Sequence, residues 1–263
     1  TELGHVERLY LWALSPNPSS MMWWMAVWYT IYLITIIIEF ISLKMHKHSK
    51  TLMWITFLSA LATSSTLGAL IGVVEQRAYY YSALLPIYLP IISFLMGGVV
   101  LTIMSSISAK KSPTGDDPLL KPAINSFKVG LGIFFVVTVW RLIVGSYGQA
   151  EGMEIFEMSL NFQILVVLYL GTVLPFIILS TTKNPNYYII ASLITVFVHI
   201  LARIDIVSGA FKLPLFRAYD IPAVISYIPS HVEIFIFIAS ASFAVFVYLL
   251  ADKLGFLEVK EEA

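Results

Sequence analysis

Seven long apolar stretches, separated by short polar segments, constrain this chain more than any other feature. A helix needs about 20 consecutive apolar residues to cross the hydrocarbon core of a bilayer. The seven stretches cover residues 21–43, 51–74, 83–107, 122–146, 158–180, 186–210 and 229–251. Charged residues make up 12% of the chain, about half the share found in soluble domains. The sequence therefore predicts an all-α, polytopic transmembrane helix bundle, with residues 1–263 forming a single integral membrane domain.

The segments that join the predicted spans alternate in charge. One side collects Lys44, Lys47, Lys50, Lys110, Lys111, Lys121, Lys183, Lys253 and Lys260. The other side carries only Arg77, Lys212 and Arg217, with Arg8 before the first span. Because basic residues concentrate in cytoplasmic loops, residue 1 is predicted to lie outside the cell membrane and the C-terminus in the cytoplasm. The proline-rich residues 209–228 are predicted to form an outer loop.

Several polar and charged residues fall in the outer third of the predicted spans. Placing such side chains inside a bilayer costs free energy, so their presence points to a function. They are Arg141, His199, Arg203, Asp205 and Glu233, with His231 at the boundary. A quinone headgroup needs hydrogen-bond donors for its carbonyl oxygens and a route for protons, while its isoprenoid tail needs an apolar slot. This cluster therefore predicts a quinone-binding and proton-transfer site near the outer face.

Each of these residues also has a structural explanation. Arg203 and Glu233 fit an ion pair between two helices, and Ser230 with Glu233 fits an S-x-x-E capping box. Arg141 is close enough to a helix end to extend to the headgroups, and His199 fits a hydrogen-bonded core position. Glu39 stands apart in the inner third of the first span. It is a weak candidate for a proton path, with a locally hydrated acid as the alternative.

The sequence argues against several other chemistries. It contains no Cys, so it offers no thiolate ligands for an iron–sulfur cluster. A transmembrane b-type haem needs axial His ligands on facing helices, and only His199 lies well inside a span. Neither a haem nor a metal site is expected. The formal net charge of zero argues against nucleic acid as a partner, because such binding needs a basic patch.

Three stretches carry a family resemblance, in order along the chain. Residues 1–20, TELGHVERLYLWALSPNPSS, are similar to a D-L-G-R-P…R…P-N…S motif. Residues 59–98 are similar to S-x-x-H-Q-S-S-L-G…W-Y…L-P-x-x-F-x-x-S-A-x-x-x-G, and residues 203–233 to R-x-N-V…Y-x-P-S-x-x-E. Together they resemble the NrfD/PsrC-like family. Its members are quinone-interacting membrane subunits of polysulfide reductase, related molybdenum enzymes and nickel–iron hydrogenases of the HybB type.

The resemblance implies a respiratory function. By position, the signature implicates Arg203, Tyr227, Pro229, Ser230 and Glu233 in a quinone site near the outer face. It implies a menaquinone-type or other quinone as the transient ligand, with no resident cofactor in this chain. Electrons would be exchanged with an extrinsic ferredoxin-like iron–sulfur subunit, itself joined to a catalytic hydrogenase or molybdenum subunit.

The chain departs from the family pattern at three places. Thr63 and Ser64 stand where the hydrogenase-type branch has His-Gln, so any role of that His in quinone binding or proton transfer has moved or been lost. Asp205 replaces an Asn-like position and adds a charge beside Arg203. Family members carry further helices before the first motif, so we expect this chain to lack their counterparts.

Two other functions fit the same pattern of spans and charges. A secondary transporter would use the outer cluster to bind an anion, but it should show an inverted repeat, and no convincing repeat is found. A purely structural membrane anchor would keep the family shape with an inactive quinone site, as the replacement of His-Gln by Thr63-Ser64 allows.

Overall fold

The computed structural model describes residues 10–47, 49–74, 83–112, 117–147, 159–212 and 230–253. Its elements are α1 (Leu11–Leu14), α2 (Met21–Lys44), α3 (Lys50–Gly72), α4 (Leu85–Lys111), α5 (Leu120–Tyr147), the π-helix η2 (Gln163–Val173), α7 (Leu174–Thr181), α8 (Pro185–Lys212) and α9 (His231–Lys253). No strand occurs in these ranges. The prediction of an all-α fold is confirmed.

Within the described ranges, seven helical segments are long and apolar enough to cross a membrane, as the sequence predicted. The fifth segment, Ser159–Thr181, is composite, because a short α-helical start leads into η2 and then α7. No π-helix was expected from the sequence. α8 continues to Lys212, so the predicted outer loop starts later than residue 209. Residues 213–228 of that loop lie outside the described residues.

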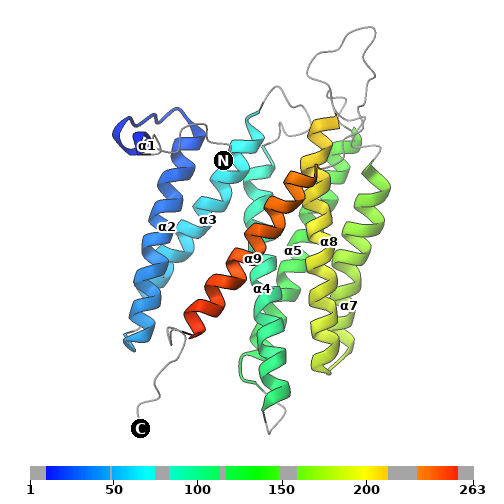
Figure 1. Cartoon of the computed structure of the whole chain (residues 1–263). Coiled ribbons are helices and arrows are strands. Elements are labelled where there is room, and N and C mark those ends of the chain that lie inside the picture. Colours follow the sequence, from blue (N-terminus) through cyan, green and yellow to red (C-terminus); the bar gives the residue numbers. More distant parts are fainter. Residues whose placement is uncertain are drawn as a thin grey trace.

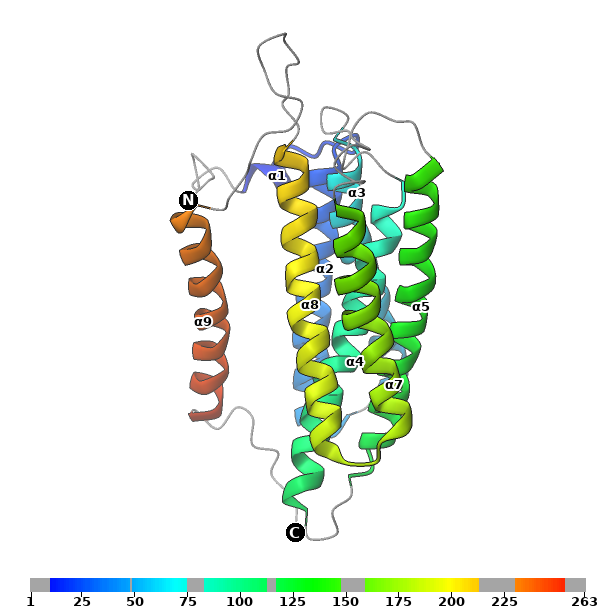
Figure 2. The same cartoon turned by 90° about the vertical axis from the view of Figure 1, so that its right-hand side faces the viewer.

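The spans form a hairpin, a central bundle and a separate helix (Figures 1 and 2). α2 and α3 pair with each other, and α3 packs in turn against α4. The central bundle of α4, α5, η2, α7 and α8 holds the apolar core, in which Leu95, Phe127 and Leu131 are fully buried. α9 stands apart from this bundle in Figure 2, and nearly all its described side chains are exposed. The central bundle is therefore the part of the molecule with a conventional protein interior.

Glycines set how closely α4 and α5 approach. A Cβ added at Gly98 would lie 3.0 Å from the Cα of Phe127, and one added at Gly130 would lie 3.1 Å from the Cα of Leu95. Lipid tails are as apolar as these helices, so association depends on close packing, which small residues permit. The two glycines therefore explain why α4 and α5 form the tightest pair of the bundle.

Hydroxyl groups join the hairpin of α2 and α3. The Thr35 and Ser59 hydroxyls lie 3.3 Å apart in a buried contact between the two helices. The Ser49 side chain accepts a hydrogen bond from the Leu52 backbone N–H and so caps the start of α3. Together they hold a hairpin whose remaining side chains mostly face outward.

The two ends of the molecule differ in charge. One end, which we call the basic end, carries Lys44, Lys47, Lys50, Lys110, Lys111, Lys121, Lys183 and Lys253 at or beside the helix termini. The opposite end, which we call the Arg203 end, carries Arg141, Arg203 and Lys212 among its described basic residues. In Figure 1 the basic end is at the bottom, where α2, α4 and α9 terminate.

The contact between α3 and α4 gives a first testable prediction. A Cβ at Gly68 would overlap the backbone oxygen of Leu85, whereas a Cβ at Gly97 would meet nothing within 4 Å. We expect Gly68→Ala to destabilise the protein by about 1–3 kcal/mol, the usual cost of overpacking. Gly97→Ala, the matched control, should be neutral or stabilising, because Ala is favoured over Gly in helices by about 1 kcal/mol. Thermal unfolding in detergent measures the stability of both variants. Equal changes in stability would contradict close packing of Gly68 against Leu85.

Candidate functional site

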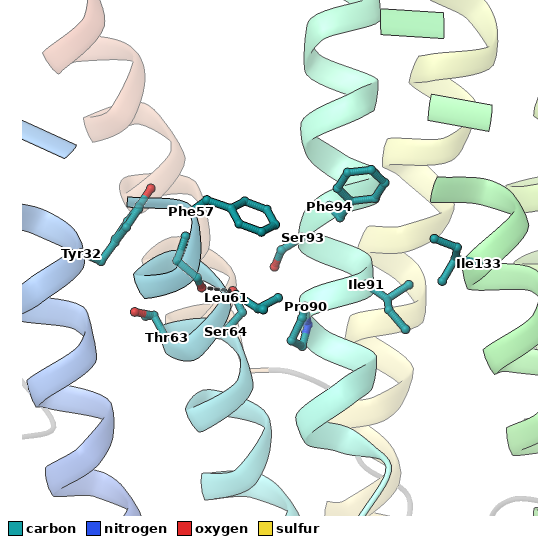
Figure 3. A pocket seen from close by; sticks show the side chains of 11 residues that line it. Tyr32, Phe57, Leu61, Thr63, Ser64, Pro90, Ile91, Ser93, Phe94 and Ile133 are labelled. Carbon is teal, nitrogen blue, oxygen red and sulfur yellow. Dashed lines mark hydrogen bonds between the residues drawn. The ribbon is translucent and has the colours of Figure 1, made fainter. Parts of the chain in front are cut away.

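A cavity of about 540 Å³ lies between the α2–α3 hairpin and α4. Figure 3 shows its wall, which is lined by Tyr32, Phe57, Ala60, Leu61, Thr63, Ser64, Pro90, Ile91, Ser93, Phe94 and Ile133. Phe57, Leu61 and Phe94 are themselves exposed on the outside of the helices. The cavity, which we call the slot, is therefore open on the apolar surface that a bilayer would cover.

The sequence of α3 and α4 explains where the slot forms. At Gly68 the two helices touch, because nothing larger than hydrogen separates its backbone from Leu85 and Pro86. Farther along the pair, Leu61 and Ser93 face one another across open space (Figure 3). Pro90 lies inside α4 on the wall of the slot, and an interior proline removes a backbone hydrogen bond and bends a helix. Close packing at one point and a proline beyond it together leave the gap.

The polar groups of the slot are hydroxyls. Three of them donate to carbonyl oxygens one turn earlier in their own helices, namely Thr63 to Ser59, Ser64 to Ala60 and Ser93 to Leu89. Their oxygens keep unused acceptor capacity, and the Tyr32 phenol adds a group that both donates and accepts. A ligand that fits this slot is largely apolar and carries a few oxygen atoms.

A second, polar group of side chains lies in the central bundle, on the α5 and α8 side of α4. The Phe134 ring is 4.5 Å from the His199 ring in an edge-on contact and 5.6 Å from the Tyr88 ring. The Arg141 guanidinium carbon lies 5.5 Å from the centre of the Tyr88 ring, within the range of a cation–π contact. We call Tyr88, Phe134, Arg141 and His199 the aromatic cluster. It brings α4, α5 and α8 together near the Arg203 end.

His199 is the least satisfied side chain of this cluster. It is 2% exposed, and neither of its ring nitrogens has a hydrogen-bond partner. Leaving a buried polar group without a partner costs about 1–3 kcal/mol. The Arg203 guanidinium, one turn farther along α8, acts on it electrostatically. Both ring nitrogens of His199 are therefore available to a small hydrogen-bonding ligand.

The remaining charges border the aromatic cluster. The half-buried Asp205 carboxylate accepts a 2.9 Å hydrogen bond from the amide nitrogen of Gln163, at the start of η2. It also interacts electrostatically with Lys212 and Arg141. Arg203 is exposed, and its charge reaches Tyr88 as well as His199. Around this cluster, the part of the chain that the structure describes thus combines the positive charges of Arg141, Arg203 and Lys212 with the carboxylate of Asp205.

The structure places the predicted site residues in three groups. Arg141, His199, Arg203 and Asp205 lie near one another, as described above. His231 is exposed at the start of α9, and Glu233 lies on the same first turn, although its side chain is outside the described residues. Tyr227 also lies outside them. Glu39 is distant from His199, beside the α2–α3 turn, where it lines a small cavity of about 110 Å³ with Ser42, Lys47 and Lys50.

Sequence reasoning missed two residues that hold the polar site together. Tyr88 is fully buried between Arg141 and Phe134, and Gln163 fixes Asp205. Gln163 is a polar residue in an otherwise apolar span and could have been noticed for that reason. The tyrosine gave no such signal, because tyrosine near a span end normally indicates the membrane interface.

The sequence pattern of the family described as "Polysulphide reductase, NrfD" matches residues 1–213. The chain belongs to this family. The NrfD match covers α2 to α8, including both the slot and the aromatic cluster, and ends just after Lys212. No curated protein and no solved structure matches the chain.

Membership of the NrfD family confirms the resemblance noted in the sequence. Members of the family are quinone-interacting membrane subunits of oxidoreductase complexes. Within the described residues, no group of three or more His, Cys, Asp or Glu side chains is arranged to hold a metal ion. The side chains of interest are instead hydroxyl, phenol, imidazole and guanidinium groups, which can donate hydrogen bonds to oxygen atoms.

Proposed function

We propose that this chain is the quinone-reacting membrane subunit of a respiratory oxidoreductase complex. The slot between α3 and α4 is the observation that carries the proposal. Its volume of about 540 Å³ lies within the range of small-molecule sites, about 300–1,000 Å³. Its apolar wall with a few hydroxyl groups fits a quinone ring, and its opening lets an isoprenoid tail extend into the lipid past Phe57 and Phe94.

The polar residues behind α4 supply the second part of the proposed site. Quinone reduction consumes protons, and quinol oxidation releases them. Tyr88 lies two residues from Pro90 along α4, so one helix carries both the wall of the slot and the edge of the aromatic cluster. We assign proton handling to Arg141, His199, Arg203 and Asp205. His231 and Glu233, at the start of α9, and Tyr227 are further candidates.

Electrons must reach the quinone from another subunit. The chain contains no Cys, so it supplies no thiolate ligands for an iron–sulfur cluster of its own. We propose an extrinsic ferredoxin-like iron–sulfur subunit, linked to a hydrogenase or molybdenum subunit, docked at the Arg203 end. By the positive-inside rule, the basic end then faces the cytoplasm and the Arg203 end faces outward across the cell membrane.

Purification of the complex tests the proposed partner. A tagged chain, isolated from membranes in mild detergent, should bring with it a subunit that binds several iron–sulfur clusters. Mass spectrometry identifies the subunits, and electron paramagnetic resonance counts their clusters. Isolation of the chain with transport partners, or with none while it catalyses uptake of an anion, would instead favour a transporter.

Replacement of Arg203 tests the polar part of the proposed site. We expect Arg203→Leu to lower quinone-linked electron transfer in membranes by about tenfold, since hydrogen bonds to charged groups contribute about 1.5–3 kcal/mol. Lys110→Leu, at the basic end, is the matched control and should leave the rate unchanged. The same assay applied to Glu233→Gln tests the residue on α9 that is predicted to form an ion pair with Arg203. Normal assembly with an unchanged rate would remove either residue from the site.

A further inference from the structure

Polar side chains follow one face of α8 from residue 188 to residue 199. Tyr188, Ser192, Thr195 and His199 follow one another at intervals of three or four residues, which places them on the same side of the helix. All four are buried, and Ser192 and Thr195 have no exposed surface. We call these four residues the polar row. A continuous polar stripe facing the interior of a membrane bundle is costly unless its groups find partners.

Part of the polar row has no partner in the protein. The Ser192 hydroxyl and both ring nitrogens of His199 make no hydrogen bond. The other two groups are satisfied, because Thr195 donates to the Ala191 backbone oxygen at 3.0 Å and Tyr188 to that of Thr182 at 2.8 Å. Buried polar groups in proteins are nearly always bonded to protein or to ordered water. The unpaired members of the polar row therefore indicate bound water.

α4 extends the same pattern toward the basic end. Thr102 and Ser106 lie on the core face of α4, in line with Leu95 and Val99, and both are fully buried. The Ser106 hydroxyl, like that of Ser192, has no hydrogen-bond partner. Because α4 and α8 run in opposite directions and pack together (Figure 1), Ser106 and Ser192 both lie toward the basic end. His199 lies toward the other.

The spacing of the polar row suits water rather than a larger ligand. Three or four residues of helix rise by about 4.5–6 Å. One water molecule that bonds two groups at about 2.8 Å each spans about the same distance. The neighbouring core side chain Phe134 is fully buried, and its ring lies 4.5 Å from that of His199, so an aromatic ring already occupies the interior beside this end of the polar row.

We propose that the polar row, with Ser106, binds a file of internal water molecules that carries protons between the basic end and His199. This inference rests on the proposed function, because the quinone is the acceptor of the protons. Reduction of one quinone to quinol takes two electrons from the iron–sulfur donor and two protons, and the water file delivers the protons from the basic end. Electrons then enter the protein at the Arg203 end, while protons are taken up from the side of the membrane that the basic end faces.

Side-specific proton measurements on the intact complex in proteoliposomes test this inference. The complex is inserted so that the basic end faces a trapped pH dye, and quinone reduction is started from the other side. We expect proton uptake from the dye compartment in step with quinone reduction. Ser192→Leu, which fills the position with an apolar side chain, should reduce that uptake by about tenfold. Ser192→Ala leaves room for water and should retain most of it, and Ser240→Leu, on the exposed face of α9, should retain all of it.

The outcomes separate this inference from the proposed function. Quinone reduction with protons taken only from the Arg203 side would overturn the water file and leave the proposed function intact. Equal uptake in Ser192→Leu and Ser192→Ala would overturn it as well. If the complex does not react with quinone, the proposed function fails, and the water file is judged from an experimental map of the wild-type complex. Ordered water between His199 and Ser192 would support the file, and a dry interior would overturn it.

Discussion

Filling the slot should strongly slow quinone-linked electron transfer while leaving the complex assembled. Ser93 lines the slot from α4 and is exposed, so a tryptophan at this position can extend into the cavity without disturbing the core. We expect Ser93→Trp to lower the rate of quinone reduction by about tenfold or more, because misplacing a reacting group by even 1 Å can cost about 100-fold. Steady-state assays with a water-soluble quinone analogue in purified complex measure the effect.

Val100→Trp is the matched control for this experiment. Val100 is also on α4 and is 52% exposed, but it does not line the slot. The same substitution at this site should leave the rate unchanged. The slot would lose its assigned role if both variants kept the wild-type rate, or if both lost it while still assembling with their partners. Separate measurement of reduction of the iron–sulfur subunit shows that the defect lies at the quinone and not upstream.

Replacing His199 by leucine should improve stability and damage function together. The ring nitrogens of His199 have no hydrogen-bond partner in the protein, and each ordered water that bonds such a group costs up to about 2 kcal/mol of immobilisation entropy. A leucine of similar volume has no polar atom to leave unsatisfied, so we expect His199→Leu to raise the thermal unfolding temperature. The same variant removes the group that we place between the proton supply and the quinone. Quinone reduction should therefore slow by about tenfold, equivalent to about 1.4 kcal/mol in the barrier.

The test is that His199→Leu should raise the thermal unfolding temperature and lower the rate of quinone reduction. A histidine that serves only as a core residue would give a variant with wild-type turnover and unchanged or lower stability. His199→Gln keeps donor and acceptor atoms but cannot shuttle protons, and it should resemble His199→Leu in turnover and differ from it in stability. Thermal unfolding and quinone reduction, measured on the same preparations, distinguish a structural from a proton-transferring histidine.

The spans and their charges could be predicted because both depend on local sequence. Each apolar stretch is long enough to cross the bilayer by itself, and none needs a partner helix to be recognised. The gathering of Arg141, His199, Arg203 and Asp205 followed in the same way, since alternating spans place these positions at the same depth. Asp205 was expected beside Arg203, but it lies on a different side of α8 and faces Gln163.

The slot and the interior of the bundle could not be predicted, because they depend on how separate helices pack. The slot needs the Gly68 contact with Leu85 and the proline at position 90 on the facing helix. Thr63 and Ser64 were noted only as replacements for His-Gln, whereas in the fold they form part of the slot wall. The π-helix that starts at Gln163 has no sequence signal that separates it from an ordinary apolar α-helix.

Photolabelling is the most direct test of the site assigned to the quinone. A photoreactive quinone analogue with an isoprenoid tail, activated in the intact complex, should attach to α3 and α4 within residues 57–64 and 90–94. Native quinone should compete with the label, and Ser93→Trp should abolish it. Mass spectrometry of the labelled peptides locates the attachment. Labelling confined to α8 and α9, or labelling that native quinone does not displace, would contradict the proposal that the quinone reacts in the slot.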